Sequence, residues 1–241
     1  MAASDGLTEL APGLWALRQK KGGYVHAFLA ESGGGLSLVD TLWNADGSVV
    51  LRALSQLGRR PSELKRIAIT HGHRSHLGGA ALLQRVTGAT IHAHPAEAEI
   101  LAGKRRAKRV PITLRPPSLI KFRLGLALGI PKHPSFGIDE PLRDGDAFGP
   151  FEVVHAPGHS PGHLAFWWAE RRALVAGDAI ATWPSTAPGW PDFQLDPAAH
   201  ERSLKRMASL EPLLVGVGHG EPIADGSPDR VHALAERAGG I

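Results

Sequence analysis

The sequence predicts a layered α/β fold, and three observations support this prediction. Short apolar runs rich in β-branched residues alternate along the chain with segments whose apolar residues recur at helical spacing. Of the 241 residues, 43% are hydrophobic and 21% are charged, which is typical of a globular domain. No low-complexity linker divides the chain, so we expect a single domain spanning residues 1–241.

The first part of the chain is expected to form mainly strands. Glycine-rich turns separate its short apolar runs, which indicates a meander, and strands are predicted at 14–18, 24–30 and 36–40. Helical spacing begins after them, because Val50, Leu54 and Leu57 recur along one face of residues 46–58. Gly58 is well placed to end that helix in the left-handed conformation.

Strands and helices alternate through most of the remaining chain. Asp196 and Pro197 indicate a helix start, because aspartate caps a helix N-terminus and proline needs no N–H partner there. Residues 103–136 break the pattern with five prolines and an apolar stretch at 119–130 that favours a helix, so we expect an inserted cap or lid there. Further strands are predicted at 64–70, 90–94, 151–155, 163–168, 173–176 and 213–217, and further helices at 77–86, 95–101, 196–210 and 229–238.

The composition excludes several classes of protein. The chain contains no cysteine, so any metal must be held by histidines and carboxylates. The N-terminus lacks the pattern of a secretion signal, and no apolar run approaches the roughly 20 residues that span a bilayer. We therefore expect a cytoplasmic protein without stable membrane insertion.

The basic character of the chain does not indicate a nucleic-acid partner. The formal charge is +4, and much of the excess lies in one cluster. No aromatic residues are interleaved with this cluster and no nucleic-acid module is recognisable, so a solvated loop is the expected role. The apolar stretch 119–130 leaves a homodimer contact open, and we expect a small-molecule substrate. The cluster comprises Lys104, Arg105, Arg106, Lys108 and Arg109.

Potential metal ligands follow four of the predicted strands, at or just beyond their ends. The loops at strand ends converge at one edge of an α/β sheet, so we expect these side chains to lie close together. Neutral imidazole and carboxylate groups suit zinc, iron or manganese. The four residues are His71, His159, Asp178 and His219.

The spacing within residues 70–76 adds two ligands. His71 and His73 lie two residues apart, so an extended backbone directs both imidazoles to the same side, where one metal can take both. His76 lies where the next helix begins and is expected to face a second metal. The two oxygens of Asp178 suit a bridge between the two ions.

Four segments, taken in order, resemble the motifs of the metallo-β-lactamase superfamily. They read THGHRSHLGG (70–79), APGHSPGH (156–163), VAGDAI (175–180) and GVGHGEP (216–222). The resemblance spans about residues 10–225 and is closest to the compact group related to glyoxalase II and lactonases. It implies a four-layered αββα sandwich with a metal site at one edge.

The resemblance also implies a role for each candidate residue. Asp178 resembles the bridging ligand, and Asp40 resembles a buried aspartate that orients the site through hydrogen bonds. The first metal site would be formed by His71, His73 and His159, and the second by His76 and His219.

One residue departs from the motif of the family. The usual pattern is His-x-His-x-Asp-His, and Ser75 stands where the aspartate is expected. A neutral hydroxyl is a poor ligand, so we predict that the second metal binds more weakly or that one ion suffices. The candidate catalytic residues are Asp178, Ser75 and Arg74, with Arg74 a candidate to hold a substrate anion.

These observations predict a hydrolase that depends on one or two Zn²⁺ ions, with iron or manganese as alternative metals. A metal-bound hydroxide would attack an ester, lactone, thioester, β-lactam or phosphoester. Two alternatives remain at this point. One is an iron-dependent oxidoreductase that resembles persulfide dioxygenases, and the other is a metal-binding homologue with weakened catalysis.

Overall fold

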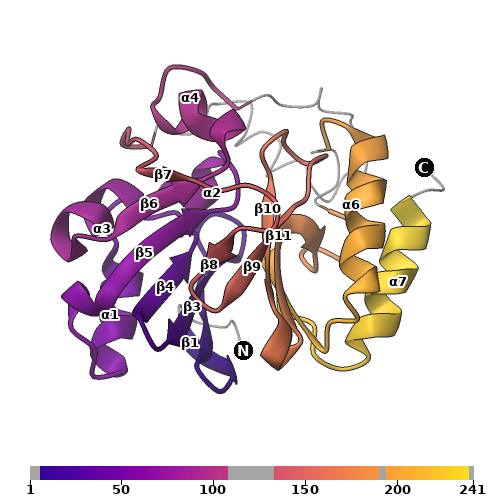
Figure 1. The fold of residues 1–241 in the computed structure, drawn as a ribbon, viewed down its shortest axis with the longest axis horizontal. Helices are drawn as coiled ribbons and strands as arrows, with labels where there is room; N and C mark the ends of the chain where they lie inside the picture. Colours follow the sequence, from indigo (N-terminus) through magenta and orange to yellow (C-terminus); the bar gives the residue numbers. More distant parts are fainter. Residues whose placement is uncertain (1–5, 108–132, 190–193, 239–241) are drawn as a thin grey trace.

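A curled β-sheet in two halves forms the framework of the computed structural model, which describes residues 6–107, 133–189 and 194–238 (Figure 1). The halves are joined where β3 pairs with β12, at Val25 and His219. The first half comprises β1 (Gly6–Ala11), β2 (Leu14–Gln19), β3 (Val25–Ser32), β4 (Gly35–Val39), β5 (Leu64–Ile69), β6 (Thr90–Ala93) and β7 (Glu140–Pro141). The second comprises β8 (Ala147–Phe148), β9 (Phe151–His155), β10 (Leu164–Trp168), β11 (Ala173–Ala181) and β12 (Leu214–His219).

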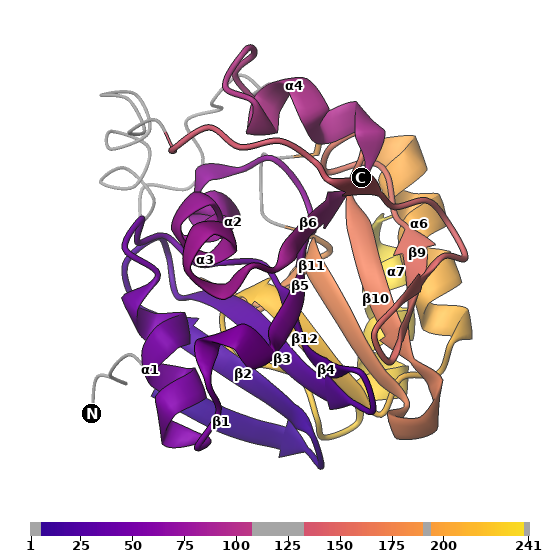
Figure 2. The same ribbon diagram turned by 60° about the vertical axis from the view of Figure 1, so that its left-hand side comes forward.

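Helices cover the outer face of each half of the sheet. Figures 1 and 2 show α1 and α3 against the first half, and α6 and α7 against the second. The two halves face each other between these helix layers, so the order is αββα, as the resemblance implied. The helices are α1 (Ser48–Gln56), α2 (Arg74–Leu77), α3 (Ala80–Thr87), α4 (Ala98–Leu101), α6 (Pro197–Ser209) and α7 (Ser227–Ala238), with short 3₁₀ turns at Pro61–Glu63, Pro95–Glu97 and Ala169–Arg171.

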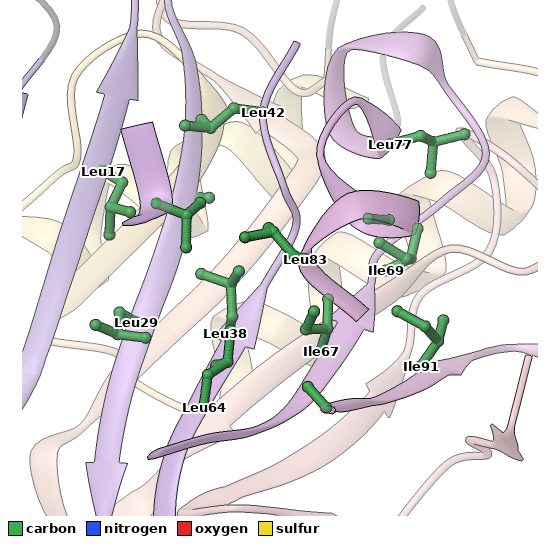
Figure 3. Close-up of a cluster of buried hydrophobic side chains, with 14 of the residues drawn as sticks. Leu17, Leu29, Leu38, Leu42, Leu64, Ile67, Ile69, Leu77, Leu83 and Ile91 are labelled. Atoms are coloured by element: carbon green, nitrogen blue, oxygen red, sulfur yellow. The ribbon is translucent and has the colours of Figure 1, made fainter. Parts of the chain in front are cut away.

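Among the described residues, three apolar cores fill the spaces between the four layers. In the first core, Leu38 and Ile67 of the sheet pack with Leu83 of α3 (Figure 3), and Leu54 of α1 belongs to the same cluster. Each of these side chains is at most 1% exposed, so their burial favours this packing by roughly 1.5–3 kcal/mol per side chain.

Alternation along the strands of the second half builds the other two cores. Successive side chains of a strand point to opposite faces. In β9, Val153 faces the central core between the halves, while Val154 faces α6 and α7. In β11, Val175 and Leu174 divide in the same way. Both faces of these strands are therefore buried, which explains their continuous apolar sequence.

Most of the predicted elements are present, with shifted ends. Gly58 and Gly88 follow their helices with φ of 68° and 75°, and Asp196 caps α6 by accepting a hydrogen bond from the Ala199 amide at 2.9 Å. The strand expected at 173–176 continues to Ala181, so Asp178 lies within it rather than beyond its end. The sequence did not predict β1, β7 and β8, because the last two contain only two residues each and β1 carries little apolar alternation.

Two predictions concern residues that the structure does not describe. The helix expected at 119–130 lies outside the described residues, as does most of the predicted lid at 103–136. Among the described residues, none of the helices has the length and hydropathy needed to cross a bilayer.

Candidate metal site

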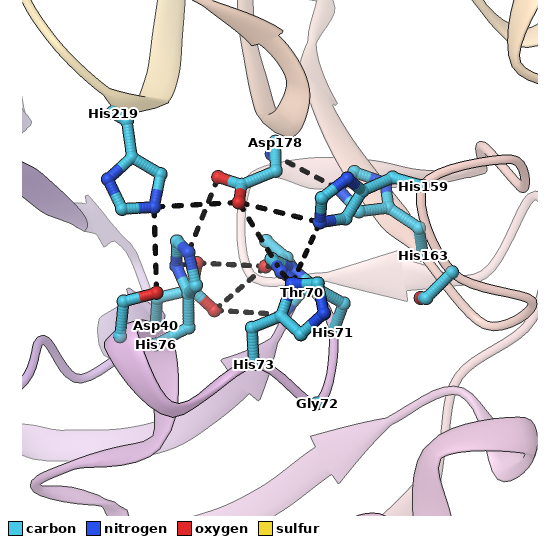
Figure 4. Close-up of polar contacts among 12 residues, drawn as sticks. Asp40, Thr70, His71, Gly72, His73, His76, His159, His163, Asp178 and His219 are labelled. Atoms are coloured by element: carbon cyan, nitrogen blue, oxygen red, sulfur yellow. Dashed lines mark hydrogen bonds and ion pairs between the residues drawn. The ribbon is translucent and has the colours of Figure 1, made fainter. Parts of the chain in front are cut away.

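The six predicted ligands meet at the edge where the two halves of the sheet join (Figure 4). Three follow β5: His71 in the loop, His73 at the N-cap of α2, and His76 within α2. The other three come from the second half, where His159 lies between β9 and β10, Asp178 lies in β11, and His219 ends β12. All six are buried except His73, which is half-buried.

A bulge in β11 directs Asp178 into the site. The pairing of β11 with β12 shifts between Val175 and Gly177, and Gly177 has φ of 54°, which favours glycine. An extra residue of this kind turns the following side chain relative to the strand. Gly218 on β12 leaves room for the carboxylate, because a Cβ there would lie 2.0 Å from Asp178 Oδ1.

The first group of ligands contains three imidazoles and the carboxylate. Nδ1 of His73 lies 2.9 Å from Nε2 of both His71 and His159. Asp178 Oδ2 is 3.5 Å from the same two Nε2 atoms. The four ligand atoms therefore surround one point, as a tetrahedral cation site requires.

The second group shares the carboxylate and contains two imidazoles. His76 Nε2 lies 3.3 Å from Asp178 Oδ1, and His219 Nε2 lies 3.5 Å from Asp178 Oδ2. Ser75 Oγ lies 3.5 Å from His219 Nε2, so the serine borders this group without adding charge.

The residues of both groups fit a bound cation. Within the described part of the chain, both carboxylate oxygens of Asp178 and Nε2 of His76 are buried without a hydrogen-bond partner, and the carboxylate contacts the surrounding imidazoles only at 3.3–3.5 Å. A buried carboxylate without hydrogen bonds carries a large desolvation cost. A cation between these atoms would remove that cost.

Hydrogen bonds on the far side of three rings fix which nitrogen faces the site. His76 Nδ1 donates to Asp40 Oδ2 at 2.8 Å, and His219 Nδ1 donates to the Gly23 carbonyl at 2.7 Å. Thr70 Oγ1 donates its single proton to Asp40, so it accepts from His71 Nδ1 at 2.9 Å. These assignments follow from the network, and they leave Nε2 of each ring as a lone-pair donor toward the site.

Burial and charge set the protonation of the ligands. Burial holds the pKa of His71 and of His159 well below the usual value, so both rings are neutral, as metal ligands must be. Burial alone would raise the pKa of Asp178, but His219 and His76 lower it well below the ordinary range. Burial would lower the pKa of His76, whereas Asp178 and Asp40 raise it to about 10. A bound cation would therefore displace a proton from His76.

Two further histidines form hydrogen bonds with the backbone around the site. His163 Nε2 accepts a hydrogen bond from the Asp178 amide at 3.2 Å, which steadies the backbone of the bridging residue. His155 Nε2 donates to the Pro161 carbonyl at 3.0 Å, in the loop that follows His159.

Arg74 lies against Trp43 rather than in open solvent. Its guanidinium lies over the Trp43 ring, 4.9 Å from the centroid, and donates to the Trp43 carbonyl. Partial burial lowers its pKa. Its role toward a substrate anion stays a prediction. Trp183 contacts Tyr24 with ring centroids 5.6 Å apart, while Trp190 and Phe193 lie outside the described residues.

Glu97 lies beside the ligand loops, a position that no local sequence motif predicted. The side chain is fully buried and accepts hydrogen bonds from Gly72, Ser160 and Gly162. One signal was available: Glu97 precedes Ile100 and Leu101 by three and four residues, so it lies on the apolar side of its helical segment. His94 caps this segment by accepting a hydrogen bond from the Ala96 amide at 3.2 Å.

Comparison with known proteins gives one family and several similar chains. The sequence profile of the family described as "Metallo-beta-lactamase superfamily" matches residues 21–219. The chain is 26% identical over 210 residues to a "Probable metallo-hydrolase YflN" of Bacillus subtilis (strain 168), covering 77% of this chain and 75% of that one.

Two other similar proteins have names that mention a reaction or a bound metal. A "Hydroxyacylglutathione hydrolase" of Methylococcus capsulatus is 29% identical over 161 residues, which is 65% of this chain and 47% of that protein. The solved structure of TTHA1623 "in a di-iron-bound form" superposes with a TM-score of 0.64 and 27% identity, covering 90% of this chain and 97% of that one.

Proposed function

Because the chain belongs to the metallo-β-lactamase superfamily and is a hydrolase, we propose that it uses a divalent cation to cleave an acyl bond in a small molecule. One observation carries this proposal: the buried carboxylate of Asp178 lies among imidazoles, and neither of its oxygens has a hydrogen-bond partner among the residues that the structure describes. The residues that would hold one or two cations are His71, His73, His76, His159, Asp178 and His219.

The cation and the side chain of Asp178 would have different roles in the reaction. A cation bound here would lower the pKa of coordinated water to about 7 and polarise the scissile carbonyl. Asp178 is the acceptor for the proton of the attacking water, since Asp40 is already engaged by Thr70 and His76. A bound cation would acidify the water, so a carboxylate would suffice to accept its proton.

A cavity beside His73 supports a small-molecule substrate. Gly72 and Ser160 line it next to the ligands, and its apolar wall is formed by Ile100, Pro161 and Leu195. Mostly apolar cavities with a few polar groups are the usual form of small-ligand sites. The acyl portion of a substrate would lie here, with its carbonyl toward His73.

The similarity to a hydroxyacylglutathione hydrolase favours a thioester as the first substrate class to test. Esters and lactones present the same carbonyl group and form the next class. A β-lactam or a phosphoester would need a different shape or charge around the reacting atom, so these two classes rank lower.

The direct test is metal removal coupled to a substrate screen. We expect purified protein to contain zinc, iron or manganese, to hydrolyse a thioester, ester or lactone, and to lose this activity after exhaustive chelation. Adding Zn²⁺ back should restore turnover. Hydrolysis that continues at the same rate after complete metal removal would contradict the proposal.

A second candidate function is an iron-dependent oxidoreductase resembling persulfide dioxygenases, favoured by the di-iron form of TTHA1623. Two imidazoles and one carboxylate, here His76, His219 and Asp178, form a ligand set that suits iron. Bound iron together with oxygen consumption on a persulfide would support this candidate. A chain that retains no metal after purification would indicate the weakened homologue instead.

A further inference from the structure

The carboxylate of Glu97 lies between the two loops that carry the first group of ligands. Its Oε2 accepts a hydrogen bond from the Gly72 amide at 3.0 Å. Its Oε1 accepts from Ser160 Oγ at 2.7 Å and from the Gly162 amide at 2.9 Å. The side chain is 0% exposed, so these bonds are made away from competing water.

Each loop held by this carboxylate carries imidazole ligands next to the bonded residue. Gly72 lies between His71 and His73, and Ser160 directly follows His159. The first loop belongs to one half of the sheet and the second loop to the other. The two oxygens of Glu97 therefore set the separation of the loops whose imidazole nitrogens lie 2.9 Å apart across the site.

Two glycines leave room for the carboxylate of Glu97 because they have no side chain. A Cβ at Gly72 would lie 2.7 Å from Ile100 Cγ2 and 2.8 Å from Glu97 Oε2, and a Cβ at Gly162 would lie 2.8 Å from Glu97 Oε1. Neither glycine has a positive φ, so close packing by Glu97, and at Gly72 also by Ile100, accounts for the missing side chains. The sequence thus provides space for a charged group that an ordinary core would exclude.

The segment that carries Glu97 is firmly placed. Pro95 begins its 3₁₀ turn, and the His94 ring caps it while stacking on His155 with ring centroids 4.4 Å apart. Ile100 and Leu101, one turn later, are buried. The carboxylate is therefore delivered from a rigid element rather than from a loose loop.

We propose that Glu97 is a positioning residue for the cation held by His71, His73 and His159. It fixes the distance between the two ligand loops and places a negative charge just outside the imidazoles, which strengthens the binding of a cation. This inference rests on the proposed metal-dependent function. Outer groups that orient metal ligands typically contribute about 10- to 100-fold to metal affinity or activity.

The test replaces Glu97 with glutamine and uses Glu99 as a matched control. Glu97→Gln removes the charge and presents an N–H₂ group either to the Gly72 amide or to the donors at Ser160 and Gly162, so donor meets donor on one side. Glu99→Gln makes the same chemical change two residues away, on an exposed side chain that contacts Arg105. Zn²⁺ affinity would be measured by competition with a chromophoric chelator, and Co²⁺ absorption would report the geometry.

We expect Glu97→Gln to lower affinity at the tighter site by about 10- to 100-fold and to change the Co²⁺ spectrum, with Glu99→Gln matching wild type. A purely structural role would lower the unfolding free energy of the metal-free protein but leave affinity and spectrum of the folded protein unchanged. That result would overturn the inference. Wild-type protein that binds no Zn²⁺ would instead overturn the proposed function.

If Glu97→Gln does not fold, Ser160→Ala provides a second test of whether Glu97 affects metal affinity. It removes one of the three donors and retains the charge, so a smaller but measurable loss of Zn²⁺ affinity is expected. Suppose that Glu97→Gln is unfolded and that folded Ser160→Ala protein binds Zn²⁺ with wild-type affinity. Glu97 would then be needed only for folding, and the inference would be overturned.

Discussion

The two groups of ligands share one carboxylate but differ in what surrounds it. The first group adds three imidazoles from two loops, and their facing nitrogens lie 2.9 Å apart. The second adds only His76 and His219, with the Ser75 hydroxyl at its border. An aspartate at position 75 would bring a second negative charge, so this single position accounts for much of the expected difference in affinity.

The largest effect is expected when the negative charge of Asp178, which both groups of ligands share, is removed. Asp178→Asn keeps the shape of the side chain and eliminates its charge. We expect both cations to be lost or bound far more weakly, and hydrolysis to fall by more than the roughly 100-fold typical of outer groups. Metal content and kcat/KM, measured on the same preparation, would check this.

Asp144→Asn is the matched control for that variant, because this carboxylate is about half exposed and pairs with Arg206 far along the chain. It should retain wild-type metal content. Two tightly bound cations in Asp178→Asn would show that the carboxylate does not serve both groups.

A smaller effect is expected when a carboxylate ligand is added to the second group at position 75. Ser75→Asp should tighten binding there by at least about 10-fold, equivalent to 1.4 kcal/mol, because it adds a charged ligand. At a free metal concentration that fills only the tighter site of the wild-type protein, the ratio of bound metal to chain should rise from near one toward two. Calorimetric titration of chelated protein would resolve the two sites.

Ser75→Asn separates charge from size in this experiment, since it introduces a neutral side chain of similar bulk. It should leave the weaker site weak. Two equally tight sites in wild-type protein would contradict the prediction that the groups differ.

The smallest expected effect concerns His26, a buried histidine near the second group that is not a candidate ligand. Burial, followed by the charges of Arg18 and His219, lowers its pKa to about 3. The unfolded chain binds this proton near pH 6.5, so the stabilising contribution is complete above that pH and is lost as pH falls toward 3. His26→Gln should reduce the slope of unfolding free energy with pH in this window by about 1.4 kcal/mol per pH unit.

Urea unfolding of chelated protein across the pH series would measure this slope. His232→Gln alters an exposed histidine paired with Glu211 and should leave the slope nearly unchanged. An identical slope in His26→Gln and wild type would show that His26 does not resist protonation in the folded state.

The sequence predicted the layered fold because local periodicity marks its longer elements. It also singled out the six residues that the structure brings together, because His71, His73 and His76 form a compact motif and the others follow strands. It missed Glu97, whose partners Ser160 and Gly162 lie 63 and 65 residues away and share no local pattern with it. It also placed Asp178 beyond its strand, because the bulge at Gly177 depends on pairing with β12.

The six candidate ligands divide equally between the halves of the sheet, with three after β5 and three from the second half. Within the site, neither half could surround a cation without the other. A bound ion would therefore act as a crosslink between the N-terminal and C-terminal portions of the chain. Loading with metal should raise the cooperativity of unfolding, because separating the halves would also require releasing the ion.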